Sequence, residues 1–216
     1  MVATFALVAS APLITVAVVL VKLTSPGPAF FRQKRIGQNG EPFILVKLRT
    51  MSAAKPGSMV TSANDPRITT IGRWLRRTKI DELPSFWNVI RGDMALVGPR
   101  PEVPNYVDLD CSKWKEILSV RPGLADPVTA QLRNEQELLS QVENTDDFYR
   151  EVLQPYKLDG YLKFVRGKDV RNDLLVLYHT TRAAVLPGSA APPTLDELRS
   201  GKDAASPQLV YEACSR

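Results

Sequence analysis

The chain begins with a long run of apolar positions. Residues 2–21 (VATFALVASAPLITVAVVLV) contain no charged side chain, and a helix of this length can cross a bilayer. Pro12 lies near the middle of the run, where a proline removes a backbone hydrogen bond and bends a helix. The pattern is compatible with a membrane span, with a bent hairpin that enters and leaves the same face, or with a buried core helix.

Basic residues follow this apolar run: Lys22, Arg32, Lys34 and Arg35. Such charges favour the cytoplasmic side of a membrane for that end of the segment. The run lacks the positively charged start of a signal peptide, so we expect it to be retained in the mature protein.

The remaining pattern alternates between short strands and amphipathic helices. Residues 41–49 (EPFILVKLR) predict a strand that places Phe43, Leu45, Lys47 and Arg49 on one face. A second short strand is expected at 94–97. Helices are predicted at 71–78, 81–90, 112–120, 134–139, 146–156, 169–185 and 195–200. The predicted fold is therefore α+β: a mostly helical, small globular domain with a few short strands, anchored by the apolar N-terminal helix.

Composition divides the chain into three parts and shows no internal repeat. We predict a membrane segment at 1–24, a globular body at 25–186 and a tail at 187–216 that is rich in proline, alanine and serine. The 216 residues suffice for one ordinary domain and an appendage.

Charge and the scarcity of certain side chains narrow the chemistry. The formal net charge of +5 suits phosphates, anionic lipid headgroups or nucleic acid equally well. His179 is the only histidine, which argues against a histidine-based triad or a multi-histidine metal site. Cys111 and Cys214 lie far apart in the sequence and predict a reduced compartment, without a disulfide framework or a zinc site.

The sharpest local motif is Lys79-Ile80-Asp81-Glu82-Leu83-Pro84. Proline is tolerated in the first turn of a helix, so Pro84 places Asp81 and Glu82 at a helix N-terminus, where negative charge is stabilised. Next to Arg76, Arg77 and Lys79, these two carboxylates could hold Mg²⁺ and offer a nucleophile. Taken alone, such a pair more often serves only as a helix cap.

Two further features are weak when each is considered separately. The stiff turn Gly98-Pro99-Arg100-Pro101 presents one guanidinium, a group that binds phosphate oxygens in a bidentate manner. Lys47 lies on the predicted strand with apolar neighbours on its own face, although an exposed lysine is the commoner case.

In combination and in this order, the segments resemble a known family. They are the proline-containing apolar helix, SPGPAFFRQKRIG (25–37), FILVKLRTM (43–51), IGRWLRRTKIDELPSFWNVIRGDMALVGPRPEV (71–103) and SVRPGL (119–124). The chain is similar in these segments to the monotopic phosphoglycosyl transferases, the bacterial sugar transferase family that begins the assembly of surface polysaccharides and glycoproteins. The similarity is dense from about residue 12 to 124 and looser in the later helices.

The resemblance implies an activity and a set of site residues. Asp81 would attack the β-phosphate of a UDP-sugar, UMP would leave, and undecaprenyl phosphate would then take the sugar phosphate in a ping-pong reaction. Glu82 would complete the acidic pair and position Mg²⁺ together with Asp81. The family's phosphate-contacting positions correspond to Lys47, Arg76, Pro99 and Arg100.

The resemblance also implies how the enzyme meets the membrane. It predicts a re-entrant helix–break–helix over residues 1–24, bent at Ser10 and Pro12, with both ends and the catalytic domain at the cytoplasmic face of the bacterial inner membrane. The expected partners are a UDP-sugar, undecaprenyl phosphate and membrane lipid, without nucleic acid, and a homodimer is possible.

The chain departs from the family pattern in three places. Ala11 separates Ser10 from Pro12 where Ser-Pro is expected, and the basic residues and aspartate that usually precede the apolar helix are missing, which points to a truncated or misassigned start. After Gly123 the sequence LADPVTA replaces the usual Thr-Gly-Leu-x-Gln-Val, which indicates a different subgroup and a different sugar.

Two other functions remain to be separated from this one by experiment. A glycosyltransferase that uses the same lipid would release UDP rather than UMP. A basic, membrane-peripheral binding protein would explain the net charge and a cationic face of Arg73, Arg76 and Arg77, but it leaves Asp81 and Glu82 without a role.

Overall fold

The fold is mostly helical with a few short strands, as predicted, and in the part of the chain that the structure describes these strands form two two-stranded sheets. The computed structural model describes residues 1–52, 60–126, 128, 132, 134–167, 169–185 and 193–200. In chain order the elements are α1 (Val2–Thr24), β1 (Phe30–Ile36), η1 (Gln38–Gly40), β2 (Pro42–Leu48), α2 (Thr70–Arg77), η2 (Ile80–Ser85), α3 (Phe86–Arg91), β3 (Ala95–Val97), η3 (Pro104–Tyr106), α4 (Ser112–Ile117), β4 (Gly123–Ala125), α5 (Glu135–Leu139), α6 (Thr145–Phe148), η4 (Tyr149–Leu153), α7 (Gln154–Arg166), α8 (Val170–Val185) and α9 (Leu195–Ser200).

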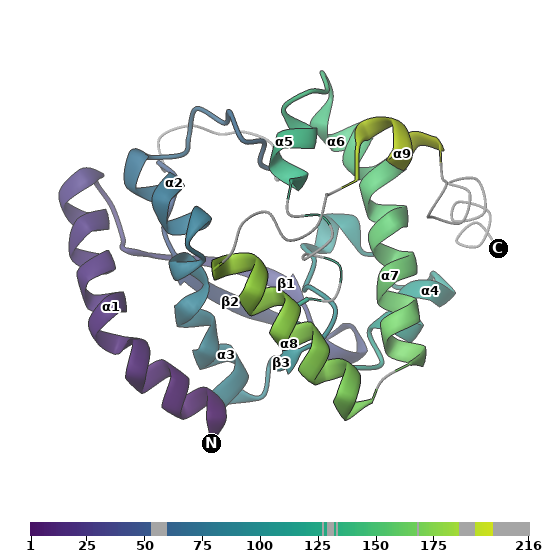
Figure 1. Cartoon of the computed structure of the whole chain (residues 1–216), viewed down its shortest axis with the longest axis horizontal. Helices are drawn as coiled ribbons and strands as arrows, with labels where there is room; N and C mark the ends of the chain where they lie inside the picture. The colour runs from purple at the N-terminus through teal and green to yellow at the C-terminus, as the bar shows by residue number, and fades with distance from the viewer. Residues whose placement is uncertain are drawn as a thin grey trace.

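The apolar segment forms one long helix that lies along one side of the molecule. α1 packs against α2, η2 and α3, and its axis curves (Figure 1). Most of its side chains face outward; Phe5, for example, is 76% exposed, whereas Ala17 and Val21 are buried. A core helix of a soluble domain would be covered on most sides, so the exposure argues against the third interpretation of the segment. The helix is long and apolar enough to cross a membrane.

Around Pro12 the backbone of α1 stays helical. α1 runs unbroken from Val2 to Thr24, so the expected break between two helices does not occur within it. Two side chains near the proline bond to backbone carbonyls that precede it: Ser10 Oγ donates to Leu7 O at 3.1 Å and Thr15 Oγ1 to Ala11 O at 2.9 Å. The re-entrant path through a membrane stays a prediction.

Two small sheets follow, and one strand of each was missed from the sequence. β1 pairs with β2 in antiparallel register, with Phe31 opposite Lys47. β3 pairs with β4 in parallel register, with Ala95 opposite Gly123. The proline-rich lead-in concealed β1, and β4 is only three residues long, too short for a recognisable period.

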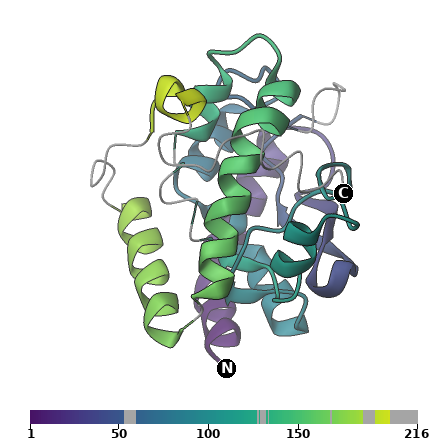
Figure 2. The same cartoon turned by 90° about the vertical axis from the view of Figure 1, so that its right-hand side faces the viewer.

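The main hydrophobic core lies in the helical half of the molecule, away from α1 (Figure 1). Trp114 of α4, Leu139 of α5, Leu153 of η4 and Tyr161 of α7 are buried there together. α6, η4 and α7 form one rod (Figure 2) that continues well past the predicted end at residue 156. The rod contains Gly160, at which a Cβ would lie 2.5 Å from a methyl carbon of Val128, so the glycine serves close packing.

Part of the predicted tail packs against this core. Leu198 of α9 is buried in the main core, and α9 contacts η4. Residues 186–192 and 201–216, and with them most of the segment predicted as a tail, lie outside the described residues.

One cysteine contradicts the expectation from spacing. Cys111 directly precedes α4, is almost fully buried and is disulfide-bonded, so the expected absence of a disulfide is wrong at this residue. Spacing along a chain does not reveal which distant segments meet in the fold. Cys214 lies outside the described residues.

The helix α2 is seated on the end of β2 through Thr50. Thr69 N donates to Thr50 O at 3.0 Å, and Arg76 Nε donates to Thr50 Oγ1 at 2.8 Å. Gly72 permits this approach, since a Cβ built there would lie 1.9 Å from Thr50 O. A close contact with backbone cannot be relieved by a rotamer change.

We therefore expect Gly72→Ala to push α2 away from Thr50 and to lower the free energy of unfolding by about 1–3 kcal/mol. In a chain of this size such a loss lowers the thermal midpoint by about 2–4 °C per kcal/mol. Thermal unfolding in detergent micelles measures it. Arg73→Ala, at an exposed position of the same helix, is the control and should leave the midpoint nearly unchanged. Equal midpoints for both variants would contradict the close packing.

Candidate active site

The acidic pair lies on a short 3₁₀ helix between two α-helices. α2 ends at Arg77, Lys79 adopts a left-handed conformation with φ of 58°, and η2 then carries Asp81 and Glu82 in its first turn. The single helix predicted for 81–90 is thus divided into η2 and α3, and Pro84 lies inside η2. The predicted end of the helix is correct, because Gly92 caps α3 with φ of 85°.

Asp81 is a buried carboxylate with an unused acceptor. Its side chain is 8% exposed, and its Oδ1 has no hydrogen-bond partner among the residues that the structure describes. Burial, and then the negative charge of Glu82, raise the pKa of Asp81, whereas Lys47, Lys79 and Arg76 oppose this shift. An acceptor of this kind is open to a partner from beyond the described residues, such as a bound ligand.

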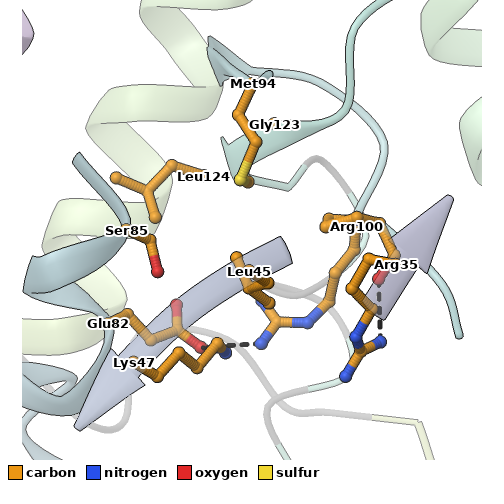
Figure 3. A pocket seen from close by; sticks show the side chains of 10 residues that line it. Arg35, Leu45, Lys47, Glu82, Ser85, Met94, Arg100, Gly123 and Leu124 are labelled. Carbon is orange, nitrogen blue, oxygen red and sulfur yellow. Dashed lines mark hydrogen bonds and ion pairs between the residues drawn. The ribbon is translucent and has the colours of Figure 1, made fainter. Parts of the chain in front are cut away.

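Glu82 contacts two cations that come from different segments. Its Oε1 accepts from Lys47 Nζ at 2.9 Å and from Arg100 Nη2 at 2.6 Å (Figure 3). Burial would raise the pKa of Glu82, but Arg100 and Lys47 hold it well below its ordinary value, so the carboxylate is ionised. Burial lowers the pKa of Lys47 to about 8, and the charge of Glu82 limits that shift.

Side chains from η2 and α3 fix the strand that carries Lys47. Ser85 Oγ donates to Val46 O at 2.8 Å. Asn88 Oδ1 accepts from Val46 N at 3.1 Å, and its Nδ2 donates to Ile44 O at 2.7 Å. These bonds occupy the edge of β2 that faces away from β1, so that Lys47 and Glu82 are brought together.

Neither Ser85 nor Asn88 was identified from the sequence. The available signal was the occurrence of two polar residues, three positions apart, on the buried side of an apolar helix.

The turn that carries Arg100 is packed backbone against backbone on a second motif. Gly123 N donates to Pro99 O at 2.8 Å, and Gly98 N donates to Ala125 O at 3.0 Å. A Cβ on Gly123 would lie 2.0 Å from Gly98 N, so glycine is required there. The segment Arg121-Pro122-Gly123 therefore holds the turn of Arg100 in place. Pro99 itself is buried and shapes this turn.

The arginines of α2 do not share one exposed face as expected. Arg73 and Arg77 are exposed, whereas Arg76 is partly buried and bonds to Thr50. Burial lowers the pKa of Arg76, and the charge of Asp81 opposes this. Arg76 thus belongs to the surroundings of Asp81, together with Lys47 and Lys79.

A small, open recess lies beside this network. Its charged wall consists of Arg35, Lys47, Glu82 and Arg100 (Figure 3). Asp81 precedes Glu82 on η2 and is not among the lining residues. The predicted residues Lys47, Glu82 and Arg100 are in direct contact, Asp81 and Arg76 adjoin them, and Ser10 and Pro12 lie apart on α1.

A carboxylate pair within a group of lysine and arginine side chains is an arrangement suited to phosphate-group chemistry. The comparison with protein families agrees with this class. The chain belongs to the bacterial sugar transferase family, whose model matches residues 1–186.

Sequence comparison with individual proteins shows which members of the family the chain resembles. Over 99 residues the chain is 48% identical to a putative undecaprenyl-phosphate N-acetylgalactosaminyl 1-phosphate transferase of Bacillus subtilis, covering 45% of this chain and 55% of the relative. Identity is 48% over 119 residues to a UDP-glucose:undecaprenyl-phosphate glucose-1-phosphate transferase of Caulobacter vibrioides, covering 53% and 45%. The Escherichia coli protein with that same name is 35% identical over 175 residues, covering 76% and 36%. The chain thus spans about half or less of the length of these relatives.

The bonds from Ser85 and Asn88 to β2 predict graded effects of truncation. Ser85→Ala removes one bond to Val46 and should lower the free energy of unfolding by about 1 kcal/mol. Asn88→Ala leaves buried backbone groups of Val46 and Ile44 unpaired and should cost about 2–3 kcal/mol. Thermal unfolding of both variants measures the order of the two effects. A larger loss for Ser85→Ala than for Asn88→Ala would refute this account of β2.

Proposed function

We propose that the protein transfers a sugar 1-phosphate from a UDP-sugar to undecaprenyl phosphate and releases UMP. The reaction would be the first membrane step in the assembly of a surface glycan. The observation that carries the proposal is the buried Asp81, whose Oδ1 has no hydrogen-bond partner among the described residues, adjoining the Lys47–Glu82–Arg100 network. The relatives named above support the substrate class, since their names contain undecaprenyl phosphate and, for two of them, UDP-glucose. These relatives differ in their sugar, so the proposal names a class of UDP-sugars.

In the first step, an oxygen of Asp81 attacks the β-phosphorus of the UDP-sugar. The bond from that phosphorus to the bridging oxygen breaks, UMP leaves with the electron pair, and an aspartyl phosphosugar is formed. A carboxylate needs no general base for this attack, which agrees with a chain that has a single histidine. The raised pKa of Asp81 makes it a better nucleophile than an ordinary carboxylate once it is ionised.

In the second step, a phosphate oxygen of the lipid attacks the same phosphorus. The bond to Asp81 breaks, the carboxylate is regenerated, and a diphosphate links the sugar to the lipid. Phosphoryl transfer depends mainly on charge neutralisation and in-line positioning, which Lys47, Arg76 and Arg100 would supply.

The resting arrangement of charges suits an incoming anion. Lys47 and Arg100 are held by Glu82, so a substrate phosphate would compete with that carboxylate for the same two cations. Glu82 thereby offsets part of the positive charge of Lys47 and Arg100 while no substrate is bound.

The apolar helix supports a location at the cytoplasmic face of the inner membrane. α1 carries exposed apolar side chains and contacts both η2 and α3, next to the acidic pair. A helix embedded in lipid in this position would hold the site at the depth of lipid phosphates. The exposed Trp74 of α2 and Trp87 of α3 suit the membrane–water interface.

The acidic pair fits a magnesium ion. Carboxylate oxygens are the ligands that Mg²⁺ prefers, and it usually combines one or two of them with substrate phosphates and water. The partnerless Oδ1 of Asp81 offers one such ligand, and Glu82 offers a second carboxylate. In the described ranges no group of three or more metal-binding side chains occurs, so the substrate would complete the coordination. The ion would supply neutralisation of the diphosphate charge.

Asp81→Asn should abolish the reaction, because an amide cannot form the phosphosugar ester. We expect UMP release and labelled lipid product to fall by more than about 10³-fold, as measured in membranes with a radiolabelled UDP-sugar and undecaprenyl phosphate. Asp110→Asn, at an exposed aspartate, is the matched control and should retain activity. Undiminished product from Asp81→Asn would remove the covalent mechanism, and release of UDP by the wild type would assign the alternative glycosyltransferase reaction.

Metal removal gives an independent prediction. Treatment with EDTA should stop UMP release, and added Mg²⁺ should restore it, because the diphosphate charge is otherwise insufficiently neutralised near two carboxylates. A UMP assay on dialysed enzyme, titrated with Mg²⁺, measures this. Full activity in excess EDTA would exclude a dissociable metal.

A further inference from the structure

One strand of the site carries a cation that the proposed mechanism has not used. On β1, Phe31, Gln33 and Arg35 alternate with Arg32 and Lys34, and the register places Phe31 opposite Lys47 and Gln33 opposite Leu45. Arg35 therefore shares the face of the sheet on which Lys47 lies. It lines the same recess as Lys47 and Arg100 (Figure 3).

The guanidinium of Arg35 is fixed at the turn that carries Arg100. Its Nε and Nη2 donate to Gln33 Oε1 at 3.0 and 2.7 Å. Its Nη1 donates to Pro101 O at 2.9 Å, one residue beyond Arg100. A guanidinium fixed by these hydrogen bonds loses little further conformational entropy when it binds a ligand.

A buried pair of residues stands behind Arg35. Glu102 lies 3.9 Å from Arg35 Nη1 and accepts a hydrogen bond from the hydroxyl of Tyr149 in η4. The helical rod thus helps to position the guanidinium through Glu102. The Arg35 side chain remains 20% exposed, so a ligand in the recess can reach it.

The recess has an excess of positive charge. Three of its lining residues are cationic, Arg35, Lys47 and Arg100, and one is acidic, Glu82. Burial and the neighbouring Arg100 both lower the pKa of Arg35, whereas Glu102 raises it. Each guanidinium adjoins one carboxylate, Glu102 for Arg35 and Glu82 for Arg100, and a phosphate in the recess would be shared by both guanidinium groups. The built features of the recess therefore point to a phosphate group.

In-line displacement relates two phosphates of the reaction to one position. The leaving group departs opposite to the attacking Asp81 oxygen, and the second nucleophile must approach the phosphosugar from that same side. The position vacated by the UMP phosphate is thus the position that the lipid phosphate enters. Since both are phosphate monoesters, one set of cations can serve both in turn.

We propose that Arg35, with Arg100, binds the phosphate of the departing UMP and afterwards the phosphate of the incoming lipid. The inference rests on the proposed function and adds a binding residue to it. Gln33, Glu102 and Tyr149 are positioning residues for this guanidinium.

The test uses the full-length enzyme in lipid nanodiscs with a UDP-sugar on which the wild type is active. In ping-pong kinetics, kcat/KM for the UDP-sugar reports the first half-reaction and kcat/KM for undecaprenyl phosphate reports the second. Arg35→Gln should lower both by about 10- to 100-fold, because a charge-assisted phosphate contact is lost in each. The inhibition constant of UMP should rise by a similar factor.

The controls separate binding from folding. Arg32→Gln removes the same charge from the outer face of the same strand and should leave all three constants within about twofold of the wild type. Arg35→Lys keeps the charge but loses the bidentate fork, so it should recover part of the loss. A merely structural defect would reduce the amount of active enzyme without raising the inhibition constant of UMP.

Unchanged constants in Arg35→Gln, or a change in only one of the two half-reactions, would overturn this inference. Either result leaves the proposed function intact as long as the wild type releases UMP. Release of UDP by the wild type, by contrast, would remove the proposed function itself.

Discussion

The contact of Glu82 with Lys47 and Arg100 joins three segments that are far apart in the sequence. Lys47 comes from β2, Glu82 from η2 and Arg100 from the turn after β3. Because isolated charges are costly to bury, each of these groups is acceptable in its place only with the other two present. The arrangement therefore requires β2, η2 and the turn to be held in fixed relative positions, and much of the surrounding structure serves that requirement.

These three segments are held in position mainly by contacts to backbone atoms. Ser85 and Asn88 bond to the main chain of β2, and Gly72 lets α2 rest on Thr50. Gly98 and Gly123 bring the turn of Arg100 against β4 at a separation that excludes a side chain. A site built in this way is rigid, and rigid placement of cations is what stabilisation of a phosphoryl transition state needs. α1 adds a different contribution, because it places an exposed apolar surface next to the same elements.

Sequence patterns predicted the secondary-structure elements better than the contacts between them. The apolar run of α1, the alternation in β2 and the glycine at the end of α3 each leave a local signal, and all three were located correctly. The strands β1 and β4 were missed, since their identity depends on a partner strand and not on their own residues. The continuation of the rod beyond residue 156 was missed as well, because the burial of Tyr161 and the close contact of Gly160 with Val128 are decided by packing with distant segments.

For the site, the family resemblance identified Asp81, Glu82, Lys47, Arg76 and Arg100, but no pattern revealed that Glu82 holds Lys47 and Arg100. Ser85, Asn88 and Arg35 were overlooked as site residues because their importance arises from tertiary contacts. Polar residues on the inner face of a helix or strand are the signal that could have found them.

The most direct test of the central claim is the mass of the enzyme after incubation with a UDP-sugar in the absence of lipid. Proteolysis and mass spectrometry should then find the peptide that contains Asp81 heavier by one phosphosugar, and undecaprenyl phosphate should remove the added mass. UMP release without an adduct, or an adduct on a peptide other than that of Asp81, would contradict the account.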